Sequence, residues 1–173
     1  MRFNDFLKST VLLMAGEATA LAAISVVTAA TRSETLVLIE VLVLMTIAGV
    51  AGGLLGRRSA ASAGISSLLA DARSESALPP IRPSLMLVNR LWPLGPYALL
   101  FAGASFAYPQ VTGVGAAFLI FQALVWRKQE SAVTAIEERD GVRFYVVKGS
   151  PLRRIQLVRT PGMRRVTSLN GAS

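Results

Sequence analysis

Two long apolar stretches constrain this chain most. They cover residues 9–31 and 36–56, and each is interrupted by a single charged residue, Glu17 in the first and Glu40 in the second. A helix needs roughly 20 apolar residues to cross the hydrocarbon core of a bilayer, and both stretches are long enough. The sequence therefore predicts a polytopic membrane protein.

The chain also lacks side chains on which many catalytic and metal sites depend. Of its 173 residues, 53% are hydrophobic and 16% are charged, against roughly 25% charged residues in soluble domains. It contains no cysteine and no histidine, which excludes disulfides, thiolate metal sites and the histidine base of an ordinary hydrolase triad. Haem and copper centres are not expected, because histidine is their usual ligand. We therefore expect a protein that is not an enzyme and has no cofactor or metal.

The remaining apolar sequence predicts two further spans. The connector Arg32-Ser33-Glu34 is so short that the second span must return antiparallel to the first. Residues 85–126 form an apolar region about twice as long as one span needs, and prolines interrupt it. We divide it at Tyr108-Pro109-Gln110 into a third span, residues 91–107, and a fourth, residues 111–126. Both are short, so we expect a kink or interfacial turn around residues 89–96.

The basic residues orient these four spans. Cytoplasmic loops of membrane proteins are enriched in lysine and arginine. With the N-terminus inside, four spans leave only Arg32 outside among the 18 lysines and arginines, whereas three spans would place the basic tail outside. We therefore expect an all-α protein of the bacterial inner (cytoplasmic) membrane, with four transmembrane helices and both termini in the cytoplasm.

The polar segments predict smaller cytoplasmic elements. Residues 1–10 indicate an amphipathic lead-in at the interface, and a cleaved signal peptide is the less favoured alternative. The helical spacing of Ile65, Leu68, Leu69 and Ala72 predicts a short surface helix. The chain then divides into a first helix pair (1–58), a loop (59–84), a second helix pair (85–126) and a basic tail (127–173).

The tail changes character along its length. Residues 127–140 are expected to extend the fourth span as a helix that Gly141 ends. Residues 142–147 and 154–158 are rich in β-branched and aromatic side chains and predict a small cytoplasmic β-hairpin. An isolated hairpin is marginally stable in water. We therefore expect it to pack on the membrane surface, on the loop 59–83 or on a partner.

The run ERDGVRFYVVKGSPLRRIQLVRTPG, residues 138–162, resembles the tail of small four-span membrane proteins of actinobacterial type. The resemblance implies a four-span membrane protein from a bacterium. It carries no catalytic residues across to this chain.

The carboxylates within the spans are the sharpest candidates for function. A charged side chain at the bilayer centre costs about 2.5–3.5 kcal/mol on insertion scales, so Glu17 and Glu40 should face the bundle interior. They lie at different depths and cannot form one acid pair. We favour structural hydrogen bonding, with Arg90 and Gln122 as plausible partners of Glu17. A path for protons or cations is the alternative.

Two overlapping GxxxG pairs in the second span, Gly49 with Gly53 and Gly52 with Gly56, predict close helix packing. The first span offers a matching face of small residues through Ala15, Thr19, Ala22 and Ala23. The sequence does not decide whether this packing joins helices of one chain or helices of two chains.

Arginines in the tail predict a surface for anionic lipid head groups or for a partner protein. Nucleic acid is a less favoured ligand, although Phe144 and Tyr145 could stack on bases. The arginines concerned are Arg143, Arg153, Arg154, Arg159, Arg164 and Arg165.

These observations favour a non-catalytic accessory or assembly subunit of a larger inner-membrane complex, of respiratory or cell-envelope type. Its partners would be membrane lipids and other membrane subunits, not nucleic acid. The alternative is a small transporter or ion-conducting homo-oligomer that uses Glu17 and Glu40. An enzyme acting on lipid is a third reading, but no nucleophile or acid pair supports it.

Overall fold

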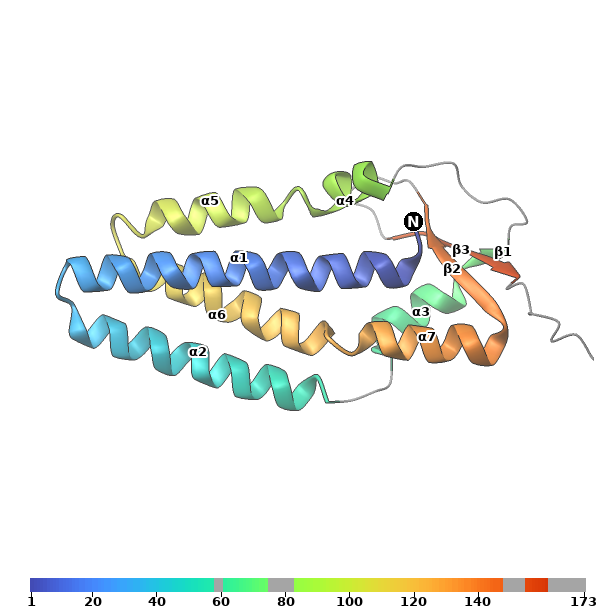
Figure 1. The fold of residues 1–173 in the computed structure, drawn as a ribbon, viewed down its shortest axis with the longest axis horizontal. Coiled ribbons are helices and arrows are strands. Elements are labelled where there is room, and N and C mark those ends of the chain that lie inside the picture. The colour runs from blue at the N-terminus through green and yellow to red at the C-terminus, as the bar shows by residue number, and fades with distance from the viewer. Residues whose placement is uncertain (58–60, 75–82, 148–154, 162–173) are drawn as a thin grey trace, which may run out of the picture.

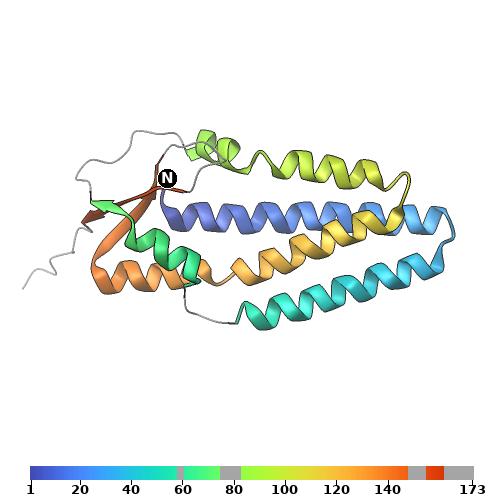
Figure 2. The same ribbon diagram turned by 180° about the vertical axis from the view of Figure 1, so that it is seen from behind.

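The computed structural model describes residues 1–57, 61–74, 83–147 and 155–161. Long helices form a bundle, and a small mixed domain, which we call the head, covers one end of it (Figures 1 and 2). The bundle contains α1 (Phe3–Thr31), α2 (Thr35–Leu55), α4 (Pro83–Leu91), α5 (Leu94–Ala104) and α6 (Pro109–Trp126). The head contains the start of α1 together with α3 (Ala63–Ala70), α7 (Gln129–Asp140), β1 (Arg73–Ser74), β2 (Val142–Val146) and β3 (Leu157–Pro161).

Three helical segments of the described chain are long and apolar enough to cross a membrane: α1, α2 and the stretch Gln110–Asp140 that covers α6 and α7. This is consistent with a multi-pass membrane protein. The predicted third span, residues 91–107, is not one spanning helix, because α4 ends at Leu91 and the chain turns before α5 begins at Leu94. With 11 residues, α5 extends only about 16 Å at 1.5 Å per residue. The predicted kink is confirmed, whereas a fourth span is not shown.

The turn between α1 and α2 is a Schellman motif. Ser33 adopts a left-handed conformation, with φ of 55°. The backbone N–H of Ser33 donates to the carbonyl of Ala30, and that of Glu34 donates to the carbonyl of Ala29, each at 3.1 Å. This turn reverses the chain, so α2 runs antiparallel to α1, as the short connector predicts.

A second turn lies beside it, at the end of the bundle far from the head (Figure 1). The chain turns after α5, and Tyr108 precedes the first residue of α6, Pro109. The Arg32 guanidinium donates a hydrogen bond to the carbonyl of Phe106 at 2.6 Å and so joins the two turns. The predicted division of the second apolar region at residues 108–110 is confirmed.

Helix α6 is the central helix of the bundle, since both α1 and α2 pack along it more extensively than they pack on each other. Glycines make this approach close. A Cβ at Gly113 would lie 2.5 Å from Val41 Cγ2 of α2, and one at Gly115 would lie 2.5 Å from Phe101 Cδ1 of α5. Helices α2 and α5 reach this part of α6 because a larger residue is absent at both positions.

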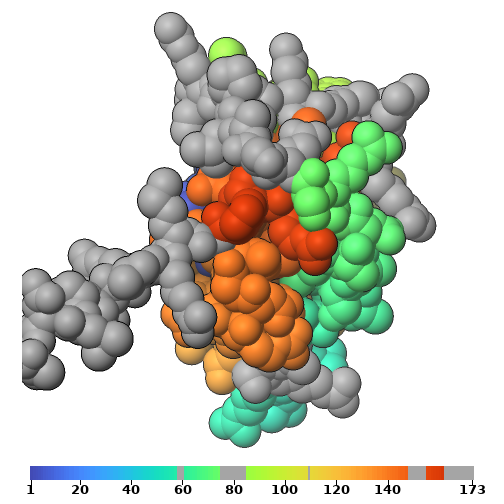
Figure 3. All heavy atoms as spheres, turned by 90° about the vertical axis from the view of Figure 1, so that its right-hand side faces the viewer, coloured from blue at the N-terminus to red at the C-terminus, as the bar shows by residue number. Residues whose placement is uncertain are grey.

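The head has a hydrophobic core of the kind found in soluble domains. Phe3, Phe6 and Leu7 of α1 are almost completely buried in it. Seen from the head end, α7, α3 and β3 cover the bundle (Figure 3). The first turns of α1 are therefore part of this core, and the predicted interfacial lead-in at residues 1–10 is wrong. The other buried members of the core are Ile65, Leu69, Met86, Val133, Phe144, Val146 and Leu157.

The predicted hairpin is present and belongs to a three-stranded sheet in the order β1-β3-β2. Strand β3 pairs antiparallel with β2, with Tyr145 opposite Val158, and parallel with the short β1. Strand β3 begins at Leu157 and includes Pro161, so it lies further along the chain than the predicted strand 154–158. Because β1 and α3 belong to the segment 59–84, the hairpin packs on this loop, one of the three supports expected for it.

Two further expectations concern helices of the head. The short surface helix is confirmed as α3, whose Ser62 cap accepts a hydrogen bond from the Ile65 N–H at 3.4 Å. Helix α7 does not simply extend α6, because the chain turns at residues 127–128. Helix α7 ends at Gly141, as predicted, in the left-handed conformation that glycine adopts easily, with φ of 63°.

Candidate functional site

Glu17 lies on α1 inside the bundle and is half-buried. Its Oε1 atom is buried and has no hydrogen-bond partner among the residues that the structure describes. Tyr97 of α5 is close enough to interact with it electrostatically. The Tyr97 hydroxyl donates its hydrogen bond to the carbonyl of Gly115, at 3.1 Å. The carboxyl of Glu17 thus lies in a mainly apolar interior beside a tyrosine.

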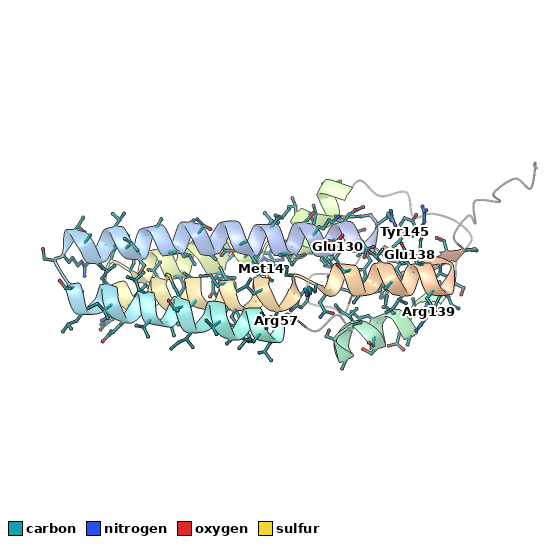
Figure 4. All side chains as sticks on the ribbon, turned by 60° about the horizontal axis from the view of Figure 1, so that its bottom comes forward. Met14, Arg57, Glu130, Glu138, Arg139 and Tyr145 are labelled. Carbon is teal, nitrogen blue, oxygen red and sulfur yellow. The ribbon has the colours of Figure 1, made fainter. Side chains whose placement is uncertain are left out.

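Arg90 and Gln122, the expected neighbours of Glu17, come together in a cavity of ≈ 280 Å³ between α4, α5, α6 and α1. Tyr97 lines the same cavity, as does Met14, which lies one turn from Glu17 on α1. Figure 4 shows Met14 within the bundle. The structure therefore brings three of the predicted intramembrane polar residues, Glu17, Arg90 and Gln122, to one region of the bundle.

Glu40 lies elsewhere. It is exposed on α2, where the neighbouring side chains Leu36, Ile39 and Val43 are also exposed. Only Val37, Val41 and Gly52 of this helix are buried. The expectation that Glu40 faces the bundle interior is wrong, because the opposite face of α2 is the one that packs against α6.

The two GxxxG pairs of α2 have different surroundings. A Cβ at Gly52 would lie 3.0 Å from the Phe121 carbonyl oxygen of α6, and a Cβ at Gly56 would overlap the carbonyl oxygen of Leu124. A Cβ at Gly49 or Gly53 would meet no atom within 4 Å. Gly52 and Gly56 therefore pack against α6. The sequence had suggested the small residues of α1 as a matching face, and these glycines do not contact them.

A buried carboxylate in the head is the site residue that sequence analysis missed. Glu137 of α7 accepts a hydrogen bond from the backbone N–H of Phe144 at 2.9 Å. It also accepts hydrogen bonds from the side chains of Asn4 and Arg2, each at 3.3 Å. The Asn4 amide donates in addition to Thr134 Oγ1 at 2.9 Å. Glu137 joins α1, α7 and β2.

Glu137 begins a charged run, residues 137–140, of the kind typical of a solvated helix end. The available signal was spacing, since Gln129, Val133 and Glu137 recur every four residues and all three are buried on one face of α7. The next residue, Glu138, is exposed (Figure 4).

Other contacts hold the chain start to the rest of the head. The Met1 carbonyl accepts a hydrogen bond at 3.1 Å from the N–H of Val146, the last residue of β2. The Lys8 ammonium pairs with the Glu130 carboxylate at 2.8 Å. These contacts join the first residues of the chain to β2 and α7.

Of the predicted lipid- or partner-binding arginines, Arg143 and Arg159 lie in the described sheet and are exposed. Arg159 pairs with Phe144 across the two strands, so these side chains share one face of the sheet. Arg143 comes directly before Phe144 in β2 and therefore projects from the other face. The Arg159 guanidinium donates to Ser74 Oγ at 3.0 and 3.2 Å. Arg143 and Arg159 therefore do not form one basic surface. The remaining predicted arginines, Arg153, Arg154, Arg164 and Arg165, lie outside the described residues.

Within the described ranges, no three acidic side chains are grouped so that they could hold a metal ion. The arrangement instead offers a mainly apolar cavity that contains Arg90, Tyr97 and Gln122, an exposed carboxylate on α2 and a closed head. The chain matches no known protein-family model, no curated protein and no solved structure.

Proposed function

We propose that the protein is a non-catalytic accessory or assembly subunit of a larger membrane complex, and that it docks through the outer face of α2. The observation that carries this proposal is the exposure of Glu40 on an otherwise apolar helix. A charged side chain inside a span carries an insertion cost that is largest at the bilayer centre, and Glu40 lies in the second turn of α2. A partner helix with a basic, hydroxyl or amide side chain level with Glu40 would remove this cost.

The extent of free surface on α2 supports the same role. Exposed apolar side chains continue along the helix from Leu36 to Leu54. Beside them, Gly49 and Gly53 have open space, and small residues allow another helix to approach closely. A membrane partner that covers this face would use the side of α2 that the chain's own helices leave uncovered.

The distribution of charge supports a cytoplasmic head. Among the described lysines and arginines, Arg32 lies at the far end of the bundle, and the others lie at the head end or in the head (Figures 1 and 4). By the positive-inside rule the head would face the cytoplasm of a bacterial cell, with α4 and α5 together crossing the inner membrane as a fourth span. Exposed arginines of the head, such as Arg143, would then lie near anionic lipid.

A transporter or ion-conducting homo-oligomer remains the alternative, with weaker support. It needs Glu17 and Glu40 on one path, but Glu17 lies near Tyr97 of α5 and Glu40 lies on the outer face of α2. A path through both carboxylates would have to pass between copies of the chain.

The experiment is a mild-detergent pull-down of the tagged protein from native membranes, read by native gels and mass spectrometry. We expect a stoichiometric set of other membrane subunits with the natural sequence, loss of this set with Glu40→Gln, and retention with Glu138→Gln. Glu138→Gln is the control, because it also replaces a carboxylate with an amide, but at an exposed position of the head.

A photo-crosslinking residue at Val43, beside Glu40, locates the contact. It should attach to one of the recovered subunits, whereas the same residue at Leu99, exposed on α5, should not. Recovery of the protein alone, as a monomer or homo-oligomer, would contradict the accessory role. Proteoliposome flux assays on Glu17→Gln and Glu40→Gln would then test the alternative.

A further inference from the structure

The cavity between α4, α5, α6 and α1 combines one cationic side chain with a largely apolar wall. Arg90 contributes the charge, and two of its guanidinium nitrogens, Nε and Nη2, are buried. Gln122 and Tyr97 contribute polar groups, and none of the described lining residues is acidic, with the carboxyl of Glu17 near Tyr97 but outside the lining. The rest of the wall is apolar and includes Leu94, Phe118 and Leu119. A ligand for this site needs a negative group next to a hydrocarbon portion.

The cavity lies near the head-side membrane interface. Gln122 lies one helical turn before Trp126, the last residue of α6. Arg90 lies two residues before Trp92, which is half exposed at the break between α4 and α5. Tryptophan is enriched at the level of lipid head groups, so the two tryptophans place the cavity at the boundary between head groups and acyl chains.

The cavity is also open to the side of the bundle. Phe118, which lines it, has about half of its surface exposed, at 51%. Leu99 and Leu100 of α5 continue an exposed apolar surface toward the far end of the bundle. Acyl chains could therefore lie along the bundle while a head group stays at Arg90.

We propose that this cavity binds an anionic phospholipid, with its phosphate at Arg90 and its acyl chains against Phe118 and the exposed surface of α5. Basic pockets between transmembrane helices on the cytoplasmic side suit anionic lipid head groups. The other basic residues at the head end favour anionic lipid in the same leaflet. This proposal does not depend on the accessory role.

The test uses the purified full-length protein in detergent, mixed with equal amounts of phosphatidylglycerol and phosphatidylcholine that carry identical acyl chains. Native mass spectrometry counts which lipid stays bound. We expect a preference of about fivefold for phosphatidylglycerol, the effect of one arginine near the membrane surface. Arg90→Gln should reduce the preference to about equal binding. Arg57→Gln should keep it, because Arg57 is exposed just after α2 and is not among the described residues that line the cavity.

A second arm separates the lipid from its head group. Glycerol phosphate and inorganic phosphate should not displace phosphatidylglycerol, because they lack the hydrocarbon that the apolar wall contacts. Displacement by either would show a site for free phosphate compounds and overturn the lipid assignment. Equal binding of the two lipids to the natural protein, or an unchanged preference in Arg90→Gln, would also overturn it.

Leu94→Trp serves as a second variant in case Arg90→Gln does not fold. It fills the cavity without changing the charge, and size-exclusion chromatography reports whether it remains monodisperse. A folded Leu94→Trp protein should lose the preference for phosphatidylglycerol. If it keeps the preference, the lipid does not bind in this cavity.

Discussion

The side-chain amide of Asn4 donates a hydrogen bond to the carboxylate of Glu137 at 3.3 Å, across 133 positions of the chain. Both residues are buried in the head. The bond joins the first turn of the first long helix to the last turn of the last helix. The start of α1 is therefore held by the tail, and the head can form only when both are in place.

We expect Glu137→Ala to destabilise the head. The substitution leaves the buried N–H of Phe144 without its acceptor, which costs about 1–3 kcal/mol of unfolding free energy. Thermal melting of the purified protein in detergent measures the loss. Glu138→Ala, at the exposed neighbouring position, should melt within a degree or two of the natural protein. Equal melting temperatures for the two variants would contradict the role of Glu137.

The glycines of α2 make a matched pair of substitutions. In Gly56→Ala the new methyl group would overlap the carbonyl oxygen of Leu124, whereas in Gly53→Ala it would meet open space. Overpacking of this kind typically costs about 1–3 kcal/mol. We expect a lower melting temperature for Gly56→Ala and little change for Gly53→Ala. The reverse order would show that α2 packs on α6 through its other face.

Replacing Ser33 with glycine should stabilise the protein. Ser33 has φ of 55° in the turn after α1, and the left-handed conformation costs a residue with a Cβ roughly 1–2 kcal/mol. Glycine at this position of a Schellman motif avoids that cost. Thermal melting should show a rise for Ser33→Gly, and Ser33→Val should show a fall. A fall for the glycine variant would rule out the left-handed turn.

Cysteine labelling can test the topology, because the chain contains no natural cysteine. Single cysteines at Ser33 and Phe106 lie at the two joined turns far from the head. We expect a membrane-impermeant maleimide to label both from the outside of intact cells. A cysteine at Glu138 should react only after the membrane is opened. Labelling of Phe106 and Ser33 from opposite sides would contradict the arrangement of α5 and α6.

Local features of the sequence were sufficient for the two long helices of the first pair and for several helix ends. The long apolar stretches predict α1 and α2, because the thickness of a bilayer sets the length of an apolar helix. Tyr108-Pro109 marks the turn before α6, and Gly141 marks the end of α7. These signals depend on proline, on glycine or on the length of an apolar run, and all of them lie within one continuous segment of the chain.

The faces of the helices could not be predicted in the same way. Helix α2 is apolar all round, as membrane-spanning helices are, so nothing in its sequence indicates whether Glu40 faces α6 or the outside. Its rotation depends on how Gly52 and Gly56 approach α6, a contact between distant segments.

The same holds for the head. Sequence by itself determined a mostly helical protein with helices long and apolar enough to cross a membrane and a small sheet near its C-terminus. Only the tertiary structure decided that Glu137 is buried with Asn4, because a carboxylate can be buried only where donors from other segments meet it. Those donors come from α1 and β2, which are far apart in the sequence. Only folding brings them to Glu137, so no local pattern in the sequence indicates the contact.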